Sequence, residues 1–215
     1  YHLNALKKLG MKYEIKKGYI HATSKGKLKG RNIKFPNISV GATENSIIAA
    51  SLASGQTILK NCAIEPEIKD LVNFLRKTGC KIKWISKRSI KIIGINRLKK
   101  ITYSVMFDRI EAGTYLVAAA ITKGNLKIKN IIPKIIKTEI DILKKIGSKI
   151  KINKNEVQVI GNRKIKSIKI KTAPYPGFPT DLQAQMMVLL CKANKSSTIQ
   201  ENIFENRFMH VAELN

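Results

Sequence analysis

One short pattern occurs three times in the sequence, at nearly equal spacing. It reads Ala5-Leu-Lys-Lys-Leu-Gly10, Phe74-Leu-Arg-Lys-Thr-Gly79 and Ile142-Leu-Lys-Lys-Ile-Gly147, and its glycines are 69 and 68 residues apart. Each copy is typical of the last turn of an amphipathic helix that ends at a glycine in the left-handed conformation. The spacing therefore predicts a structural repeat of about 70 residues.

The same kinds of element follow each of these glycines. Alternating apolar residues around polar turns predict three β-hairpins, each with one buried face. A further short strand is expected around Ile33, Tyr103 and Ile168. A loop, a helix and another short strand follow. The expected helices are 45–52, 108–120 and 181–190, and the expected last strands are 57–59, 126–128 and 198–200. The sequence thus predicts an α/β fold of the α+β type, in which each repeat has two helices, about four strands and mixed strand pairing.

The charge of the chain invites a nucleic-acid hypothesis. There are 41 Lys and Arg against 14 Asp and Glu, a net charge of +27, and such charge drives binding to phosphates. However, only 7 of the 41 are Arg, which leaves 34 Lys, whereas specific contacts to phosphates and bases favour Arg. The composition favours a generally basic surface and no specific nucleic-acid partner. A lysine-rich module that binds nucleic acid or an anionic surface remains the alternative.

Several classes of protein fit the sequence poorly. It contains no run of eighteen or more apolar residues and no opening that resembles a secretory signal, so we expect a cytoplasmic protein without a membrane partner. Three cysteines without CxxC spacing argue against disulfides and zinc, and the three histidines lack metal-ligand spacing. We expect no metal site, and we expect Cys62, Cys80 and Cys191 to be small core residues.

The loops that lead into the three small-residue helices differ from the lysine-rich background. They span residues 35–43, 106–113 and 173–181. Free N–H groups at a helix start favour anions, so three such starts meeting at one cleft would suit a phosphorylated or carboxylated substrate. Thr43 and Thr180 are expected to be N-caps. Taken alone, Ser39 fits a turn hydroxyl, Asp181 fits a helix start and Arg207 fits a surface ion pair.

Five motifs follow one another along the chain. They are Ser39-Val-Gly-Ala-Thr-Glu-Asn45, Glu65-Pro-Glu-Ile68, Asp108-Arg-Ile-Glu-Ala-Gly-Thr114, Phe178-Pro-Thr-Asp-Leu-Gln-Ala-Gln185 and Ile203-Phe-Glu-Asn-Arg-Phe-Met-His210. Together they resemble the UDP-N-acetylglucosamine 1-carboxyvinyltransferase family of enolpyruvyl transferases. The resemblance implies an inside-out α/β barrel of six repeats in two similar domains. It implies that residues 1–106 belong to the first domain and 107–215 to the second, and that the chain is an internal fragment of a monomeric protein.

The resemblance also implies a reaction and its residues. The family transfers the enolpyruvyl group of phosphoenolpyruvate to the 3′-hydroxyl of UDP-N-acetylglucosamine and releases phosphate, without a cofactor, in the first committed step of peptidoglycan synthesis. Asp181 matches the proposed catalytic base. The family's reactive Cys or Asp would precede Tyr1, so we expect residues 1–215 alone to be inactive. The related shikimate 3-phosphate enolpyruvyl transferases lack two of the motifs and fit less well. The implied substrate-binding residues are His2, Asn37, Ile38, Ser39, Val40, Gly41, Thr180, Ile203, Phe204 and Arg207.

Overall fold

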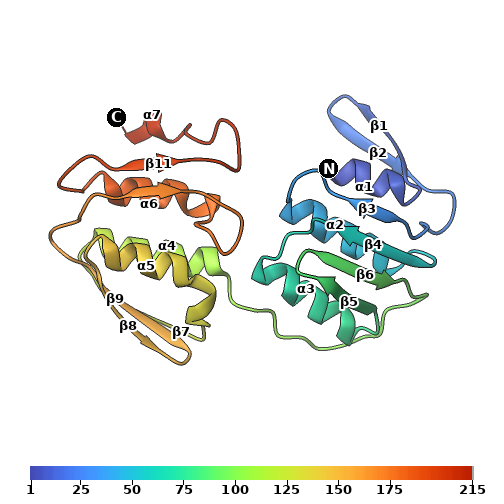
Figure 1. The fold of residues 1–215 in the computed structure, drawn as a ribbon, viewed down its shortest axis with the longest axis horizontal. Helices are drawn as coiled ribbons and strands as arrows, with labels where there is room; N and C mark the ends of the chain where they lie inside the picture. The colour runs from blue at the N-terminus through green and yellow to red at the C-terminus, as the bar shows by residue number, and fades with distance from the viewer. Residues whose placement is uncertain (215) are drawn as a thin grey trace. The chain divides into compact units, whose positions relative to one another are not determined.

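The computed structural model describes residues 1–214, and the chain in it divides into two units, Tyr1–Met106 and Phe107–Asn215. The division falls at the boundary that the sequence analysis placed after residue 106. Both units combine β-sheets with α-helices (Figure 1). No helix within residues 1–214 is long and apolar enough to cross a membrane.

Unit 1 is built around a four-stranded sheet. Its strands are β3 (Asn32–Lys34), β4 (Gln56–Lys60), β6 (Ser89–Ile93) and β5 (Lys81–Ser86), in that order across the sheet. The pair β3–β4 is parallel and the other two pairs are antiparallel, which confirms the expected mixed pairing. Alternate residues of β4 and β6 are fully buried, so one face of the sheet supplies the core.

Three helices line this core. They are α1 (His2–Lys8), α2 (Val40–Ser51) and α3 (Pro66–Lys77), and α2 packs against both of the others and against β4 and β6. Small buried residues on α2, Ala42, Ser46 and Ala50, allow its neighbours to approach closely. A fully buried aliphatic side chain contributes about 1.5–3 kcal/mol to stability, so side chains such as Ile47 and Leu59 hold the unit together.

Unit 2 repeats this plan. An antiparallel sheet contains β7 (Asn125–Lys129), β9 (Glu156–Ile160) and β8 (Lys149–Asn153), and a second sheet contains the parallel pair β10 (Lys169–Lys171) and β11 (Thr198–Gln200). Helix α4 contacts both α5 and α6 (Figure 1). The helical segments are α4 (Arg109–Ile121), η1 (Pro133–Ile136), α5 (Lys137–Lys145), η2 (Thr180–Leu182), α6 (Gln183–Leu190) and α7 (Val211–Leu214).

The structure confirms the repeat that the three glycines predicted. Gly10, Gly79 and Gly147 follow the ends of α1, α3 and α5, with φ angles of +109°, +103° and +112°. A side chain is strained in this conformation, which explains why all three positions hold Gly. The strand order β4-β6-β5 in unit 1 also corresponds to β7-β9-β8 in unit 2.

The first predicted hairpin differs from the expectation. It forms as β1 (Lys12–Lys16) and β2 (Tyr19–Thr23), but nine of its ten residues are exposed and only Tyr13 is partly covered. The prediction of a buried face is therefore wrong here. Within residues 1–214 this pair has no third strand, whereas the hairpins β5–β6 and β8–β9 each gain one and pack beneath helices.

The strand expected around Tyr103 is also absent, because that segment connects the two units. The Tyr103 hydroxyl donates a hydrogen bond of 2.8 Å to the carboxylate of Asp70 on α3, and its ring meets Phe74 edge-on at 5.4 Å. The backbone N–H of Met106 also donates to Asp70. Contacts with α3 therefore replace the strand pairing that β3 and β10 make at the corresponding positions.

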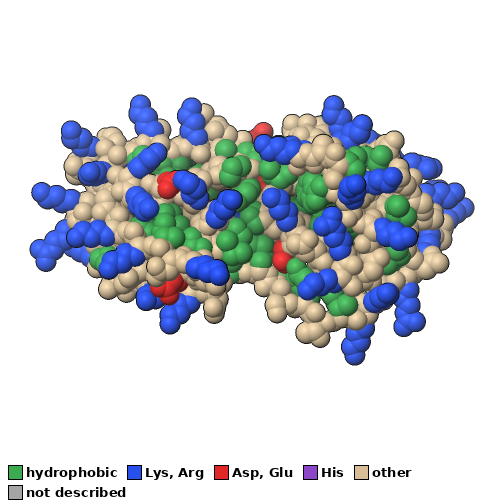
Figure 2. Space-filling model, turned by 60° about the horizontal axis from the view of Figure 1, so that its bottom comes forward, with side chains coloured by type: hydrophobic (Ala, Val, Ile, Leu, Met, Phe, Trp, Pro, Cys, Tyr) green, Lys and Arg blue, Asp and Glu red, His purple; other side chains and the backbone are tan. Residues whose placement is uncertain are grey.

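The basic side chains do not form a single patch on the face shown in Figure 2. Lys and Arg are scattered over it, with apolar and polar surface between them. This distribution agrees with the expected generally basic surface.

Candidate active site

The first candidate cluster lies at the start of α2. Ser39 has an extended backbone (φ −141°), and its side-chain oxygen accepts a hydrogen bond of 3.3 Å from the Ala42 N–H, so Ser39 is the N-cap. The helix begins at Val40, five residues before the expected start. The prediction that Thr43 caps it is wrong, because Thr43 is buried inside the first turns. Its hydroxyl donates to the Ser39 carbonyl and accepts from the Ala63 N–H.

Helix α1 brings His2 onto this turn. A methyl group at Gly41 would lie 2.8 Å from Cε1 of His2, so only Gly allows the imidazole to come this close. Nδ1 of His2 is 2.7 Å from Nδ2 of Asn45, and the Asn37 amide donates to the Tyr1 hydroxyl at 2.6 Å. The structure thus gathers His2 with the predicted residues 37–41, although they are far apart in the sequence.

A groove of about 570 Å³ lies beside this turn, between α1 and β3. Ile33 and Phe35 supply apolar lining, and Lys7, Lys8 and Lys34 supply positive charge. An apolar surface with nearby ammonium groups suits an organic anion. Sequence reasoning missed these three lysines because Lys occurs throughout the chain.

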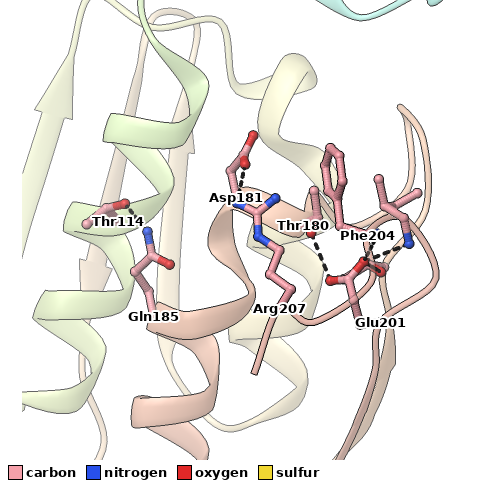
Figure 3. Close-up of polar contacts among 9 residues, drawn as sticks. Thr114, Thr180, Asp181, Gln185, Glu201, Phe204 and Arg207 are labelled. Atoms are coloured by element: carbon pink, nitrogen blue, oxygen red, sulfur yellow. Dashed lines mark hydrogen bonds and ion pairs between the residues drawn. The ribbon is translucent and has the colours of Figure 1, made fainter. Parts of the chain in front are cut away.

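The second candidate cluster lies in unit 2, where η2 leads into α6 (Figure 3). Nη2 of Arg207 is 2.6 Å from Oδ1 of Asp181, and the Arg207 guanidinium lies 5.2 Å from the centre of the Phe204 ring. The Asp181 side chain is 52% exposed, so the carboxylate is accessible. This pair agrees with the simple expectation of an ion-paired Arg207, and it also joins two residues that the family resemblance had selected.

Thr180 is not an N-cap, contrary to prediction. It is the first residue of η2, and its hydroxyl donates a hydrogen bond of 2.8 Å to Glu201 instead of accepting from the helix. Glu201 also accepts from the Thr172 hydroxyl at 2.8 Å and from the N–H groups of Ile203 and Phe204 at 2.7 and 3.2 Å. Sequence reasoning missed Glu201, since only the fold brings these donors together.

These contacts stabilise the ionised form of Glu201. Burial disfavours its ionised form, but the hydrogen bonds from the Ile203 N–H, Thr180, Thr172 and the Phe204 N–H outweigh that effect. They hold the pKa of the Glu201 carboxyl below its usual value. Glu201 is therefore a carboxylate at neutral pH, surrounded by donors.

Helix α4 supports this cluster. Gln185 of α6 donates a hydrogen bond of 3.1 Å to Thr114 of α4 (Figure 3). The α4 residue Arg109 is buried, with its guanidinium 5.8 Å from the centre of the Tyr175 ring. Burial raises the pKa of Glu139, while a hydrogen bond to its own backbone and the charge of Arg109 act in the opposite direction.

The cysteines behave differently from one another. Cys62 and Cys80 are buried, as predicted, and burial raises the pKa of Cys62 to about 12, which makes its thiol a poor nucleophile. Cys191 is exposed, so its prediction as a core residue is wrong. It directly follows the end of α6 at Leu190. Within residues 1–214, no group of three or more His, Cys, Asp and Glu residues could hold a metal ion.

The predicted site residues therefore form two clusters, one in each unit. Unit 1 holds His2 and residues 37–41, and unit 2 holds Thr180, Asp181, Ile203, Phe204 and Arg207. The meeting of the α2, α4 and α6 starts at one cleft remains a prediction, as do the substrate contacts of each residue.

Comparison with known proteins identifies the family. The family model described as EPSP synthase (3-phosphoshikimate 1-carboxyvinyltransferase) matches residues 1–215. The chain belongs to this family. Within it, the chain is 71% identical over 214 residues to the UDP-N-acetylglucosamine 1-carboxyvinyltransferase of Pelagibacter ubique (strain HTCC1062), and 50% identical over 213 residues to that of Endomicrobium trichonymphae. These matches cover 100% and 99% of the chain and 51% of each relative, so the chain spans about half their length.

Solved structures of family members confirm the fold. The enolpyruvyl transferase NikO from Streptomyces tendae superimposes with a TM-score of 0.83 at 19% identity, over 99% of this chain and 53% of NikO. An EPSP synthase from Acinetobacter baumannii gives a TM-score of 0.64 at 20% identity, over 98% of this chain and 51% of that one. At such low identity these likenesses show the fold alone. They confirm the expected α/β fold of the enolpyruvyl transferases.

Proposed function

We propose that the protein containing this chain transfers the enolpyruvyl group of phosphoenolpyruvate to the 3′-hydroxyl of UDP-N-acetylglucosamine and releases phosphate. The observation that carries this proposal is the 71% identity, over the whole chain, to a UDP-N-acetylglucosamine 1-carboxyvinyltransferase. We place the reaction in the cytoplasm, as the first committed step of peptidoglycan synthesis. The EPSP synthase likeness at 20% identity supports the fold but not the sister reaction.

The geometry at the start of α2 suits the nucleotide-sugar. Val40 and Gly41 are the first residues of α2, and the backbone N–H groups at a helix start stabilise the phosphates of a nucleotide. The neighbouring lysines add positive charge, and the groove offers apolar surface to an organic group. His2 lies on the same turn and completes this surface.

Asp181 is suited to act as the base. Within residues 1–214 its ion pair with Arg207 engages only Oδ1, so Oδ2 can accept the proton of the sugar hydroxyl. As that proton leaves, the hydroxyl oxygen bonds to C2 of phosphoenolpyruvate and a proton is added to the methylene carbon. The tetrahedral ketal then loses phosphate and a methyl proton, which restores the double bond. A carboxylate is a weak base, so the transfer depends on close positioning.

The resemblance supports three further proposals. The reaction uses only its two substrates, since addition and elimination need no redox partner, and no cofactor or metal takes part. The protein acts as a monomer. Residues 1–215 alone show no turnover, because they span about half the length of the relatives.

Phosphate release by the full-length protein tests the proposal. Release should require both phosphoenolpyruvate and UDP-N-acetylglucosamine, and D181N should abolish most of it. D141N is a matched control, because Asp141 is a half-exposed, ion-paired carboxylate elsewhere in unit 2. Release that depends on shikimate 3-phosphate instead would favour the sister reaction. No release with either acceptor, together with tight RNA binding that falls steeply with salt, would favour the nucleic-acid alternative.

A further inference from the structure

Glu201 joins three separate segments of unit 2 through one carboxylate. Its Oε2 accepts from Thr180, at the start of η2. Its Oε1 accepts from Thr172, just after β10, and from the N–H groups of Ile203 and Phe204, just after β11. Four donors within 3.2 Å leave this side chain little freedom to rotate.

The charge of Glu201 is compensated by these donors. No Lys or Arg within residues 1–214 forms an ion pair with it, and its pKa lies below the usual value because the hydrogen bonds outweigh the effect of burial. Hydrogen bonds to an ionised acceptor are roughly twice as strong as neutral ones. The same contacts would be weaker around a neutral amide.

The segments that Glu201 joins carry the predicted substrate residues of this unit. Thr180 directly precedes Asp181, and Ile203 and Phe204 belong to the predicted nucleotide-sugar set. Arg207 completes a ring of contacts, since it pairs with Asp181 and lies beside the Phe204 ring (Figure 3). The position of Asp181 relative to Phe204 therefore depends on the carboxylate of Glu201, which is not itself one of the predicted substrate residues.

We propose that Glu201 is a positioning residue, which holds the Asp181 turn and the Ile203–Phe204 segment in the arrangement that the nucleotide-sugar requires. It acts through these segments and does not itself touch the reacting atoms. The inference rests on the proposed function, because it assigns Glu201 a part in the same reaction.

Glu201→Gln in the full-length protein is the main test. The amide keeps the size of the side chain but removes its charge and one acceptor, and its NH₂ group must face a donor. We expect kcat/KM for UDP-N-acetylglucosamine to fall about 10- to 100-fold, with a higher KM for that substrate and a KM for phosphoenolpyruvate within about threefold of the wild type. Glu205→Gln is the matched control, because it removes the same charge from an exposed side chain four residues away. It should behave like the wild type.

A second pair of variants keeps the inference testable if Glu201→Gln does not fold. Thr172→Val removes one donor to Glu201, together with the acceptor of the Asn202 N–H, and leaves the predicted site residues unchanged, whereas Thr172→Ser retains the hydroxyl. We expect the same rise in KM for the nucleotide-sugar in the Val variant, but smaller, and near-normal kinetics in the Ser variant. Hydrogen exchange at the Ile203 and Phe204 amides should accelerate in the Val and Gln variants, whether or not substrate is present.

The outcomes separate this inference from the proposed function. A wild type that catalyses the reaction, with Glu201→Gln kinetics equal to those of Glu205→Gln, overturns the role of Glu201 and leaves the function intact. An equal rise in KM for both substrates also overturns it, because that pattern indicates general loosening. If the wild type is inactive, the proposed function fails. Unchanged hydrogen exchange at the Ile203 and Phe204 amides of the variants would then separately refute the proposal that Glu201 holds these segments in place.

Discussion

Gly113 is the position where one added methyl group should disturb both the core and the candidate base. It lies in the interior of α4, and a Cβ there would be 2.4 Å from Cδ1 and 3.3 Å from Cδ2 of Leu182. Leu182 is fully buried and directly follows Asp181. In Gly113→Ala the leucine side chain cannot swing into solvent, so the η2 turn must shift.

Two opposing effects determine the change in stability. Ala is better than Gly in a helix interior by about 1 kcal/mol. Forcing an additional methyl group into a packed core costs about 1–3 kcal/mol. The contact at 2.4 Å is far inside normal van der Waals distance, so we expect the packing cost to exceed the helix gain and to leave a net loss of about 1 kcal/mol. Turnover should also fall, because Asp181 moves with its neighbour.

Native-state hydrogen exchange of the α4 and α6 amides measures this loss within unit 2. The matched variant is Gly113→Ala with Leu182→Val, which removes the two carbons that clash and should recover part of the stability lost in the single variant. If the α4 and α6 amides are protected from exchange in Gly113→Ala at least as well as in the wild type, the gain in helix propensity outweighs the packing cost. The reasoning from the close approach of Leu182 would then be wrong.

Three further predictions concern single side chains. Asp181→Asn should lower turnover about 10²- to 10⁴-fold, which phosphate release measures. It should change the free energy of unfolding by less than about 1 kcal/mol, because the ion pair of Asp181 is exposed. Calorimetry measures this second effect. Iodoacetamide at pH 8 should label exposed Cys191 and spare buried Cys62, whose pKa is about 12, and peptide mass spectrometry that finds the reverse would contradict the burial of Cys62. Folding lowers the pKa of Glu201 below its value of about 4.3 in the unfolded chain. The ionised side chain therefore stabilises the protein fully above this unfolded pKa, and the stabilisation is lost as the pH falls through the folded pKa. Urea unfolding should therefore show a gap between wild type and Glu201→Gln that is constant above about pH 5.5 and shrinks in more acid solution.

The repeat could be predicted because local sequence determines it. A helix that must end at a left-handed residue requires Gly wherever it occurs, and Gly10, Gly79 and Gly147 mark the same point in successive repeats. Alternation of apolar residues likewise identifies the strands β5, β6, β8 and β9 without reference to the rest of the chain.

The helix caps could not be predicted because two residues of the right kind compete. Ser39 and Thr43 stand about one helical turn apart, and either can start a helix by local rules. The tertiary fold decides between them: Thr43 is buried and accepts a hydrogen bond from the Ala63 N–H, which lies twenty residues away in the sequence. A hydroxyl engaged in this way belongs to the helix interior.

Glu201 was missed for a related reason. Nothing near it in the sequence distinguishes it from an ordinary carboxylate at the end of a short strand. Two of its four donors come from residues 29 and 21 positions away, and the parallel pairing of β10 and β11 brings Thr172 to it. A residue whose role consists of contacts between distant segments leaves no local pattern to read.

Net charge says less about this chain than the contacts of its carboxylates do, for a physical reason. Exposed lysines are well solvated, so a basic surface requires no particular arrangement of its side chains, and Lys and Arg lie scattered over the face shown in Figure 2. A carboxylate with a defined set of partners is different, because each partner must be placed by the fold. Asp181 and Glu201 are only two of 14 acidic residues in a chain of charge +27, yet the organised contacts of unit 2 converge on them. For the proposed reaction, which begins by removing a proton from a hydroxyl, these carboxylates are more informative than the lysines.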